Sequence, residues 1–197
     1  GLMTKSGDGN LWLTATNNNS GGIVASAGKL IGTTSALQGA ITNNATVEFN
    51  QSTTGSYAGV MSGTGNLIKD GSGTVTLTAT NTYTGGTTFT GGTISVSDDA
   101  NTGTGNWTFN GGTLGVTTGY TSAKTATLSN DATFDVASGQ TLTLSSGISG
   151  LNGITKTNSG TLRNWFLVRW ANSCLMATWL DLIPSNKVLA SLFGKML

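Results

Sequence analysis

The residues that could carry acid–base chemistry are few and widely spaced. The chain has eight acidic residues and no histidine, which excludes Ser-His-Asp and Cys-His nucleophilic schemes. Only Asp98 with Asp99 and Asp131 with Asp135 lie close in sequence. Enzymes that cleave polysaccharides use paired carboxylates. Here the first pair better fits a solvated corner, and the second better fits an outward strand position and the corner before it. We assign no catalytic residue.

The sequence offers no set of metal ligands and no cofactor-binding loop. Cys174 is the single cysteine, so no Cys–His cluster is present for zinc. Residues 6–10, SGDGN, hold one carboxylate and lack the G-G-x-G-x-D pattern of calcium-binding β-rolls. They align better with the corner at residues 70–73, where Gly-x-Gly precedes a strand rather than the helix that a phosphate loop needs. We predict neither a metal nor a cofactor.

Two further kinds of residue could bind a partner. Lys5, Lys69 and Lys156 recur at one position of a repeated pattern, so the pattern explains them better than a ligand does. Trp12 takes the outward place held elsewhere by Thr76, between two inward leucines. An exposed tryptophan can stack on a sugar or on a protein partner. Packing against a neighbouring side chain is the alternative, and the sequence favours it.

Composition and charge describe an ordered β chain with many tight turns. The 197 residues include 30 glycines, only 9% are charged, and 37% are hydrophobic. A net charge of +1 gives no basic surface, so a nucleic acid partner is not expected. No uncharged apolar run reaches the length of a membrane span. The start, GLMTKSGDGN, has no signal-peptide core, so we expect this chain to be a piece of a longer protein.

The chain repeats itself at two offsets. A shift of 64 residues aligns Lys5 with Lys69 together with the glycines that follow, and a shift of 87 aligns Lys69 with Lys156. The two shifts differ by 23 residues, so we interpret them as three and four whole rungs of roughly 20–23 residues. A rung is one winding of a solenoid, which is stable only when its neighbours stack on it.

Short alternating runs within each rung predict β-strands. In the run from Thr74 to Thr78, Val75 and Leu77 share one face and threonines occupy the other. Gly-Gly and asparagine-rich segments supply the corners. Stacking in whole rungs favours a parallel β-helix over antiparallel hairpins. We expect roughly seven rungs before Leu162, a rod about 34 Å long at a strand spacing of about 4.8 Å.

The pattern stops after Leu162. We therefore divide the chain into a repeat region, residues 1–162, and a non-repeat tail, residues 163–197, which contains a single glycine, Gly194. Leu175, Trp179 and Leu182 have helical spacing, and Ser185 could cap a second helix. Two interpretations remain open: a helical cap that covers the last rung, or an out-of-frame or misjoined end.

The residues from Leu67 to Val96 resemble a known motif. Lys69-x-Gly71-x-Gly73-Thr74-Val75-x-Leu77, followed by Asn81-x-Tyr83-x-Gly85-Gly86, is similar to the passenger-associated transport repeat, or autotransporter-associated β-strand repeat. Residues 3–30 resemble a degraded copy with Asn19 in place of the tyrosine, and residues 154–162 resemble a truncated one. In that family, such repeats build right-handed parallel β-helices in the passengers of large bacterial surface proteins.

The resemblance implies a function and a location. It implies secretion through a C-terminal barrel and a place outside the outer membrane, as a structural stalk or display segment without catalysis. The chain itself has no visible export signal, so its own export stays open. An adhesin-type module that binds glycans or host proteins is the first alternative, and a carbohydrate-active enzyme is the second. Open rung edges near Gly1 and Leu162 could also drive end-to-end self-association.

Overall fold

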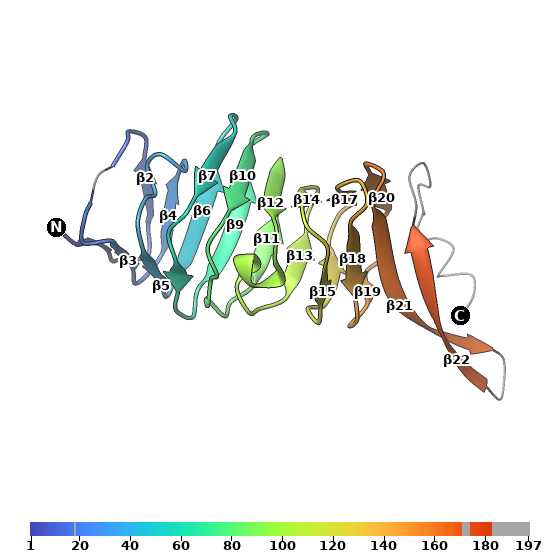
Figure 1. The fold of residues 1–197 in the computed structure, drawn as a ribbon. Helices are drawn as coiled ribbons and strands as arrows, with labels where there is room; N and C mark the ends of the chain where they lie inside the picture. The colour runs from blue at the N-terminus through green and yellow to red at the C-terminus, as the bar shows by residue number, and fades with distance from the viewer. Residues whose placement is uncertain (18, 171–173, 183–197) are drawn as a thin grey trace.

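The computed structural model describes residues 1–17, 19–170 and 174–182, which wind into an all-β solenoid (Figure 1). Apart from the last strand, every strand pairs in parallel with strands of the neighbouring rungs. The longest sheet has eight strands, so the solenoid has about eight rungs rather than the seven expected. The predicted parallel β-helix is confirmed, while its handedness stays a prediction.

Three faces enclose the core. The long face contains β2 (Asn10–Leu13), β4 (Lys29–Gly32), β6 (Thr46–Asn50), β9 (Asn66–Asp70), β11 (Thr87–Phe89), β13 (Trp107–Phe109), β16 (Ala126–Leu128) and β19 (Ile148–Ser149). The second face contains β7 (Gly55–Tyr57), β10 (Thr74–Leu77), β12 (Thr93–Val96), β14 (Thr113–Val116), β17 (Ala132–Val136) and β20 (Ile154–Thr157).

The third face is split in two. Its first sheet contains β1 (Met3–Lys5), β3 (Ile23–Ala25), β5 (Ile41–Asn43) and β8 (Met61–Ser62). Its second sheet contains β15 (Tyr120–Ser122), β18 (Thr141–Leu144), β21 (Thr161–Trp170) and β22 (Cys174–Leu182). Between the two sheets, the rungs cross this face through the segment around Tyr83 and through the 3-10 helix η1 (Asp99–Thr102).

The rungs differ slightly in length. Register partners lie 17 residues apart from Leu30 to Val47, 20 apart from Leu67 to Thr87, and 22 apart from Ala132 to Ile154. The corners absorb these differences, because the paired strands stay in register on every face. The eight strands of the long face leave seven intervals of about 4.8 Å, so the rod spans about 34 Å from its first strand to its last.

The two sequence shifts do not span whole rungs, contrary to our interpretation. Lys5 lies in β1 on the third face, Lys69 in β9 on the long face, and Lys156 in β20 on the second face. The shift of 64 therefore spans three rungs plus one further face, and the shift of 87 spans four rungs plus one further face. The longer shift still contains one rung more than the shorter one. The motif fits any face because all three present the same strand–corner–strand geometry.

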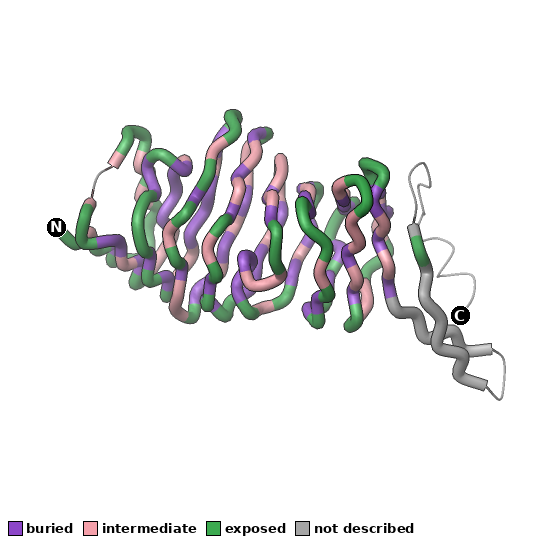
Figure 2. Tube along the Cα trace, viewed as in Figure 1, coloured by how far each residue is buried: buried purple, intermediate pink, exposed green. Residues whose placement is uncertain are grey.

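Alternation along the strands builds one continuous core. Val75 and Leu77 in β10 are buried, whereas Thr74 and Thr76 are half-buried, as the sequence pattern predicted. Figure 2 shows this alternation of buried and more exposed residues along the rod. The side chains of one inward position stack on their counterparts in adjacent rungs, so each rung closes the core of the previous one.

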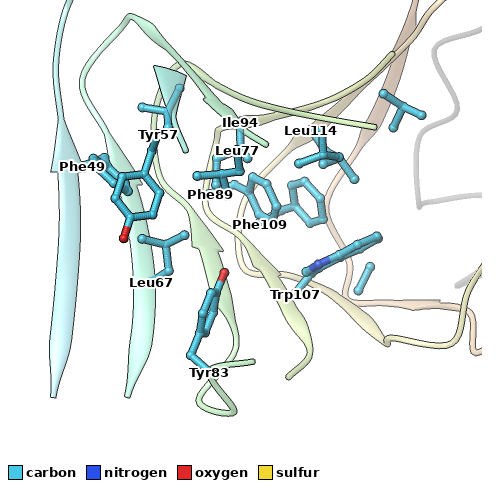
Figure 3. Close-up of a cluster of buried hydrophobic side chains, with 14 of the residues drawn as sticks. Phe49, Tyr57, Leu67, Leu77, Tyr83, Phe89, Ile94, Trp107, Phe109 and Leu114 are labelled. Atoms are coloured by element: carbon cyan, nitrogen blue, oxygen red, sulfur yellow. The ribbon is translucent and has the colours of Figure 1, made fainter. Parts of the chain in front are cut away.

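Aromatic side chains fill the middle of the rod (Figure 3). The rings of Phe89 and Phe109, which are register partners in neighbouring rungs, stack with centroids 4.5 Å apart and an interplanar angle of 7°. Phe134 from the second face approaches Phe109 at 4.9 Å, and Trp107 meets Phe89 edge-on at 6.4 Å. Such pairs add stability beyond the burial of their surface.

The tail does not begin with the predicted helix. β21 pairs in parallel with β18 from Thr161 to Asn164, continues to Trp170, and then pairs antiparallel with β22. Leu175 and Leu182, placed on a helix by their spacing, lie in β22 instead. The physical reason is that β21 leaves the last rung with an open edge, whose backbone groups a hairpin partner satisfies. The second predicted helix, after Ser185, lies outside the described residues.

Candidate functional site

Each recurring lysine donates hydrogen bonds to a corner of the solenoid from inside, a role that the sequence pattern did not reveal. Lys69 is only 1% exposed and points into the solenoid. Its Nζ donates to the main-chain oxygens of Asp70 at 2.6 Å and Gly71 at 2.8 Å in its own corner, and of Gly91 at 3.2 Å in the next rung. An ammonium carries three donors, so the carbonyl oxygens use all of them. The buried charge therefore ties two rungs together.

Lys5 repeats this arrangement, and Lys156 repeats only part of it. Lys5 Nζ donates to the main-chain oxygens of Ser6 at 3.0 Å and Gly7 at 2.6 Å, and to Ala27 of the next rung at 3.0 Å. Lys156 Nζ donates to Thr157, and to Asn158 at 2.8 Å. No rung follows Lys156 in the described part of the chain, and it has no third oxygen from a next rung. Burial lowers the pKa of both Lys69 and Lys156 from the ordinary lysine value.

The corner fits around the lysine because glycine lines it. Gly92 has φ +59, and a Cβ there would collide with the main-chain oxygens of Gly71 and Gly73 and approach Lys69 Nζ. Only glycine adopts this left-handed backbone at no steric cost. The repeated lysine and the glycines around it thus belong to one structural element.

The second half of the motif builds a buried polar ladder. Asn81 Oδ1 accepts a hydrogen bond from the main-chain nitrogen of Met61 at 2.7 Å, and its Nδ2 donates to the main-chain oxygen of Asn101 at 2.6 Å. The hydroxyls of Tyr83 and Thr87 lie 2.7 Å apart, and Tyr83 is fully buried. The Asn81 hydrogen bonds bridge neighbouring rungs, and the Tyr83–Thr87 contact lies within one rung, where no regular strand crosses the third face.

The carboxylates Asp98 and Asp99 lie at a corner, where the sequence placed them. Asp98 caps η1 by accepting a hydrogen bond from the main-chain nitrogen of Ala100 at 2.8 Å. Asp99 pairs with the buried Lys124, whose Nζ lies 2.8 Å from Asp99 Oδ1 and 5.4 Å from the centre of the Trp107 ring. Each aspartate thus holds the η1 corner.

Asp131 and Asp135 each bind the next rung. Asp131 Oδ1 accepts a hydrogen bond from the main-chain nitrogen of Gly153 at 2.7 Å, and Asp135 Oδ1 accepts one from the hydroxyl of Thr157 at 2.8 Å. Four residues of extended strand separate their backbones by about 13 Å. Paired carboxyl groups of glycosidases stand about 5–9.5 Å apart and act on a substrate between them, whereas each of these carboxylates accepts a hydrogen bond from the next rung. The polysaccharide-cleaving alternative predicts that Asp131→Asn abolishes turnover.

Trp12 faces outward, as expected. It is 55% exposed, and its register partner in the next strand is Ile31. Ile31 also lies outside the core cluster, yet it is only 2% exposed. Beyond it in the same outward row lies Glu48, which forms an ion pair with Lys29 at 2.8 Å. Trp12 therefore begins a short apolar–polar row on the outside of the long face.

The described residues contain no group of three or more His, Cys, Asp or Glu side chains that could hold a metal ion. Asp8, the single carboxylate in residues 6–10, is exposed. The corner at residues 70–73 is occupied from inside by the Lys69 ammonium. No helix in the described part of the chain is long and apolar enough to cross a membrane.

Comparison with protein families agrees with the motif. The model of the passenger-associated transport repeat matches residues 3–31 and residues 67–96. The chain contains two passenger-associated transport repeats. No curated protein and no solved structure matched it. Each repeat contains four strands, β1 to β4 in the first and β9 to β12 in the second. The repeat implies a secreted or cell-surface protein, and the solenoid fits a structural segment of an autotransporter passenger.

Tyrosine burial predicts a loss of stability at alkaline pH. Burial raises the pKa of Tyr57, Tyr83 and Tyr120 in the folded chain. Above a pH of about 10, the unfolded chain releases these protons while the folded chain keeps them, so stability falls by about 1.4 kcal/mol per tyrosine and pH unit. Lys69 and Lys156 have lowered pKa values in the folded chain, so the folded chain releases their protons first. Their contribution raises the stability with pH until the unfolded lysine pKa of about 10.4 is reached.

The loss of stability is therefore expected to be steepest above a pH of about 10.4. Urea unfolding at a series of alkaline pH values measures it, and Tyr83→Phe should make the decline about one third less steep. Stability that stays constant or rises across this range contradicts the prediction.

Proposed function

We propose that this chain is a structural stalk within the passenger of a bacterial autotransporter-like protein that is secreted or displayed at the cell surface. The observation that carries the proposal is the continuous stack of about eight rungs, tied from rung to rung by the lysine corners and the asparagine ladder. Such a rod holds whatever is attached to it about 34 Å further from its base. In this proposal the chain catalyses no reaction. In this proposal residues 1–162 form the stalk, and the tail of residues 163–197 follows it.

A stalk depends on its register and not on the identity of each rung. Deleting residues 67–86 joins Asn66 to Thr87, which is the register partner of Leu67, so every face stays aligned. Deleting residues 67–76 removes about half a rung and brings the later strands against the wrong faces. With the chain fused between a signal peptide and a translocator barrel, we expect the first deletion to preserve surface display and the second to abolish it.

The measurement is antibody binding on intact cells to an epitope placed before Gly1. Total expression is measured in parallel, so that a loss of display is not confused with a loss of synthesis. If the whole-rung deletion is displayed no better than the half-rung deletion, the stalk proposal fails.

A binding role is the second candidate, and the exposure of Trp12 favours it. The indole is 55% exposed at the start of the outward row on the long face. A stacked sugar or a host protein would cover it. We expect such a role to give a glycan-array or cell-binding signal that Trp12→Ala removes. Val60→Ala, at another exposed apolar side chain (47%), is the matched control that should keep the signal. A signal that is absent, or unaffected by Trp12→Ala, contradicts the candidate.

A further inference from the structure

A buried lysine and a carboxylate meet at the η1 corner without a hydrogen bond between their charged groups. Lys124 is 6% exposed, and its Nζ lies 2.8 Å from Asp99 Oδ1. That oxygen is buried and has no hydrogen-bond partner, although the ammonium is so close. Lys124 Nζ donates instead to the main-chain oxygen of Asp99 at 2.6 Å. The nitrogen therefore sits beside the carboxyl group without the charge-assisted hydrogen bond that an ion pair ordinarily makes.

A second ion pair of the chain shows the ordinary arrangement. Lys29 Nζ lies at the same distance, 2.8 Å, from Glu48 Oε2, and there the contact is a hydrogen bond. The side chain of Lys29 is 34% exposed, whereas that of Lys124 is 6% exposed. The two pairs thus differ in geometry and in access to water, although the distances are equal. An ammonium near water stays charged, whereas one that is shielded from water gives up its proton more readily.

The surroundings of Lys124 shield it from water and hold a second unsatisfied polar atom. The centre of the Trp107 ring lies 5.4 Å from Nζ. The hydroxyl of Tyr120 is buried and has no hydrogen-bond partner. Burial raises the pKa of Tyr120, and the charges of Asp99 and Asp98 raise it further. The phenol therefore keeps its proton, and it can donate that proton in a hydrogen bond to an oxygen of the Asp99 side chain.

Asp99 and Lys124 lie on equivalent segments of consecutive rungs. The segment with η1 connects β12 to β13, and the segment with β15 and Lys124 connects β14 to β16. β12 pairs with β14, and β13 pairs with β16. β15 pairs with β18 alone, so it has no strand partner on the side of η1. The two side chains therefore meet across a boundary between rungs that no strand ladder joins on the third face.

We propose that Lys124 and Asp99 form an intramolecular amide bond once the chain has folded. Transfer of one proton from the ammonium to the carboxylate gives a neutral amine and a neutral acid, the forms that are favoured where water is excluded. The lone pair of Nζ then bonds to Cγ of Asp99, and the bond from Cγ to the protonated oxygen breaks. The hydroxyl leaves with a second proton of Nζ, as one water molecule. The reaction needs no oxidant, reductant or further reactant.

The amide accounts for the unsatisfied atoms of this corner. It replaces a buried ion pair, which is costly to keep away from water, by a neutral group. Its carbonyl oxygen accepts a hydrogen bond from the Tyr120 hydroxyl. The Asp99 side chain is 31% exposed, so the released water has a way out. The bond closes a covalent loop between two rungs and restricts the unfolded chain, as a disulfide does. The proposal does not rest on the stalk function.

The mass of the purified, folded chain tests the proposal directly. We expect an intact mass that is lower than the sequence mass by one water molecule. Trypsin cleaves after lysines whose amine is free, so the denatured chain should be cut after Lys29 but not after Lys124. Fragmentation of the peptide that contains both residues should locate the link between Asp99 and Lys124. A full sequence mass, or cleavage after Lys124 that is as complete as after Lys29, overturns the proposal.

Three variants show whether a missing water comes from this pair. Succinimide formation at an Asp-Gly sequence elsewhere in the chain removes the same mass, but it does not need Lys124. Lys124→Arg keeps a cation, Asp99→Ala removes the carboxylate, and both should have their full sequence masses. Lys29→Arg, at the more exposed ion pair, should keep the loss of one water. A loss that persists in Lys124→Arg or Asp99→Ala contradicts the amide. Should a variant fail to fold, the mass and the tryptic cleavage of the unaltered chain still decide.

Discussion

Replacing Lys69 by methionine is expected to lower the free energy of unfolding by about 3 kcal/mol, because three main-chain oxygens lose the donor that its buried ammonium supplies. Methionine keeps the length and apolar stem of the side chain, so the change removes the charge and its hydrogen bonds with little change in packing. The oxygens of Asp70, Gly71 and Gly91 belong to half-buried corner residues, and Lys69, which donates to all three, is 1% exposed. Urea unfolding followed by circular dichroism measures the loss.

Lys156→Met is the matched control for that substitution. Lys156 holds two oxygens rather than three and lies in the last rung of the second face. Lys156→Met should therefore lower the free energy of unfolding by clearly less than Lys69→Met does. Equal effects for the two lysines would contradict the dependence on the number of oxygens bound, and a Lys69→Met protein as stable as the unaltered chain would show that the ammonium does not stabilise the corner.

Leu77→Asp is expected to abolish the cooperative melting transition. Leu77 is 1% exposed and packs in the continuous core. A carboxylate there must be either ionised without a partner or protonated at a high cost, a penalty of several kcal/mol. Because each rung is stable only through its neighbours, a disrupted rung in the middle also exposes the cores of the rungs on both sides.

Thr76→Asp tests whether the effect comes from burial rather than from strand propensity. Thr76 is the adjacent residue of β10 and is half-buried on the outer side. The added charge can reach water there, so the melting curve should stay cooperative with a small shift. Thermal melts of both variants at neutral pH decide the matter. If Thr76→Asp proves as damaging as Leu77→Asp, the assignment of inward and outward faces in β10 is wrong.

Local patterns predicted the strands well because they depend on neighbouring residues. Alternation placed Val75 and Leu77 inside. It also placed Trp12 outside, at a position that threonine holds in the other copy of the motif. The repeated glycines predicted the corners for the same reason, since a tight turn needs positive φ at Gly71 and Gly86. These inferences needed no knowledge of which rungs touch.

Contacts between rungs could not be obtained in the same way. The shifts gave a period but not the number of faces it crosses, so Lys5 and Lys69 seemed to occupy one place when they lie on different faces. The inward direction of the lysine was hidden because an isolated lysine ordinarily faces water. Its position between Phe49 and Phe89 in one inward row was the available signal, and it required the register. The hairpin of β21 and β22 was missed because an open strand edge is a property of the assembled sheet.

The offset of one face between copies has a consequence for how such a rod is decorated. The first repeat begins on the third face and the second begins on the long face. A side chain at the same outward position of each copy therefore points in a different direction around the axis. Tandem copies distribute one motif helically around the rod instead of along a single side. A partner approaching from any direction would then meet the same chemistry, at a height set by the number of intervening rungs.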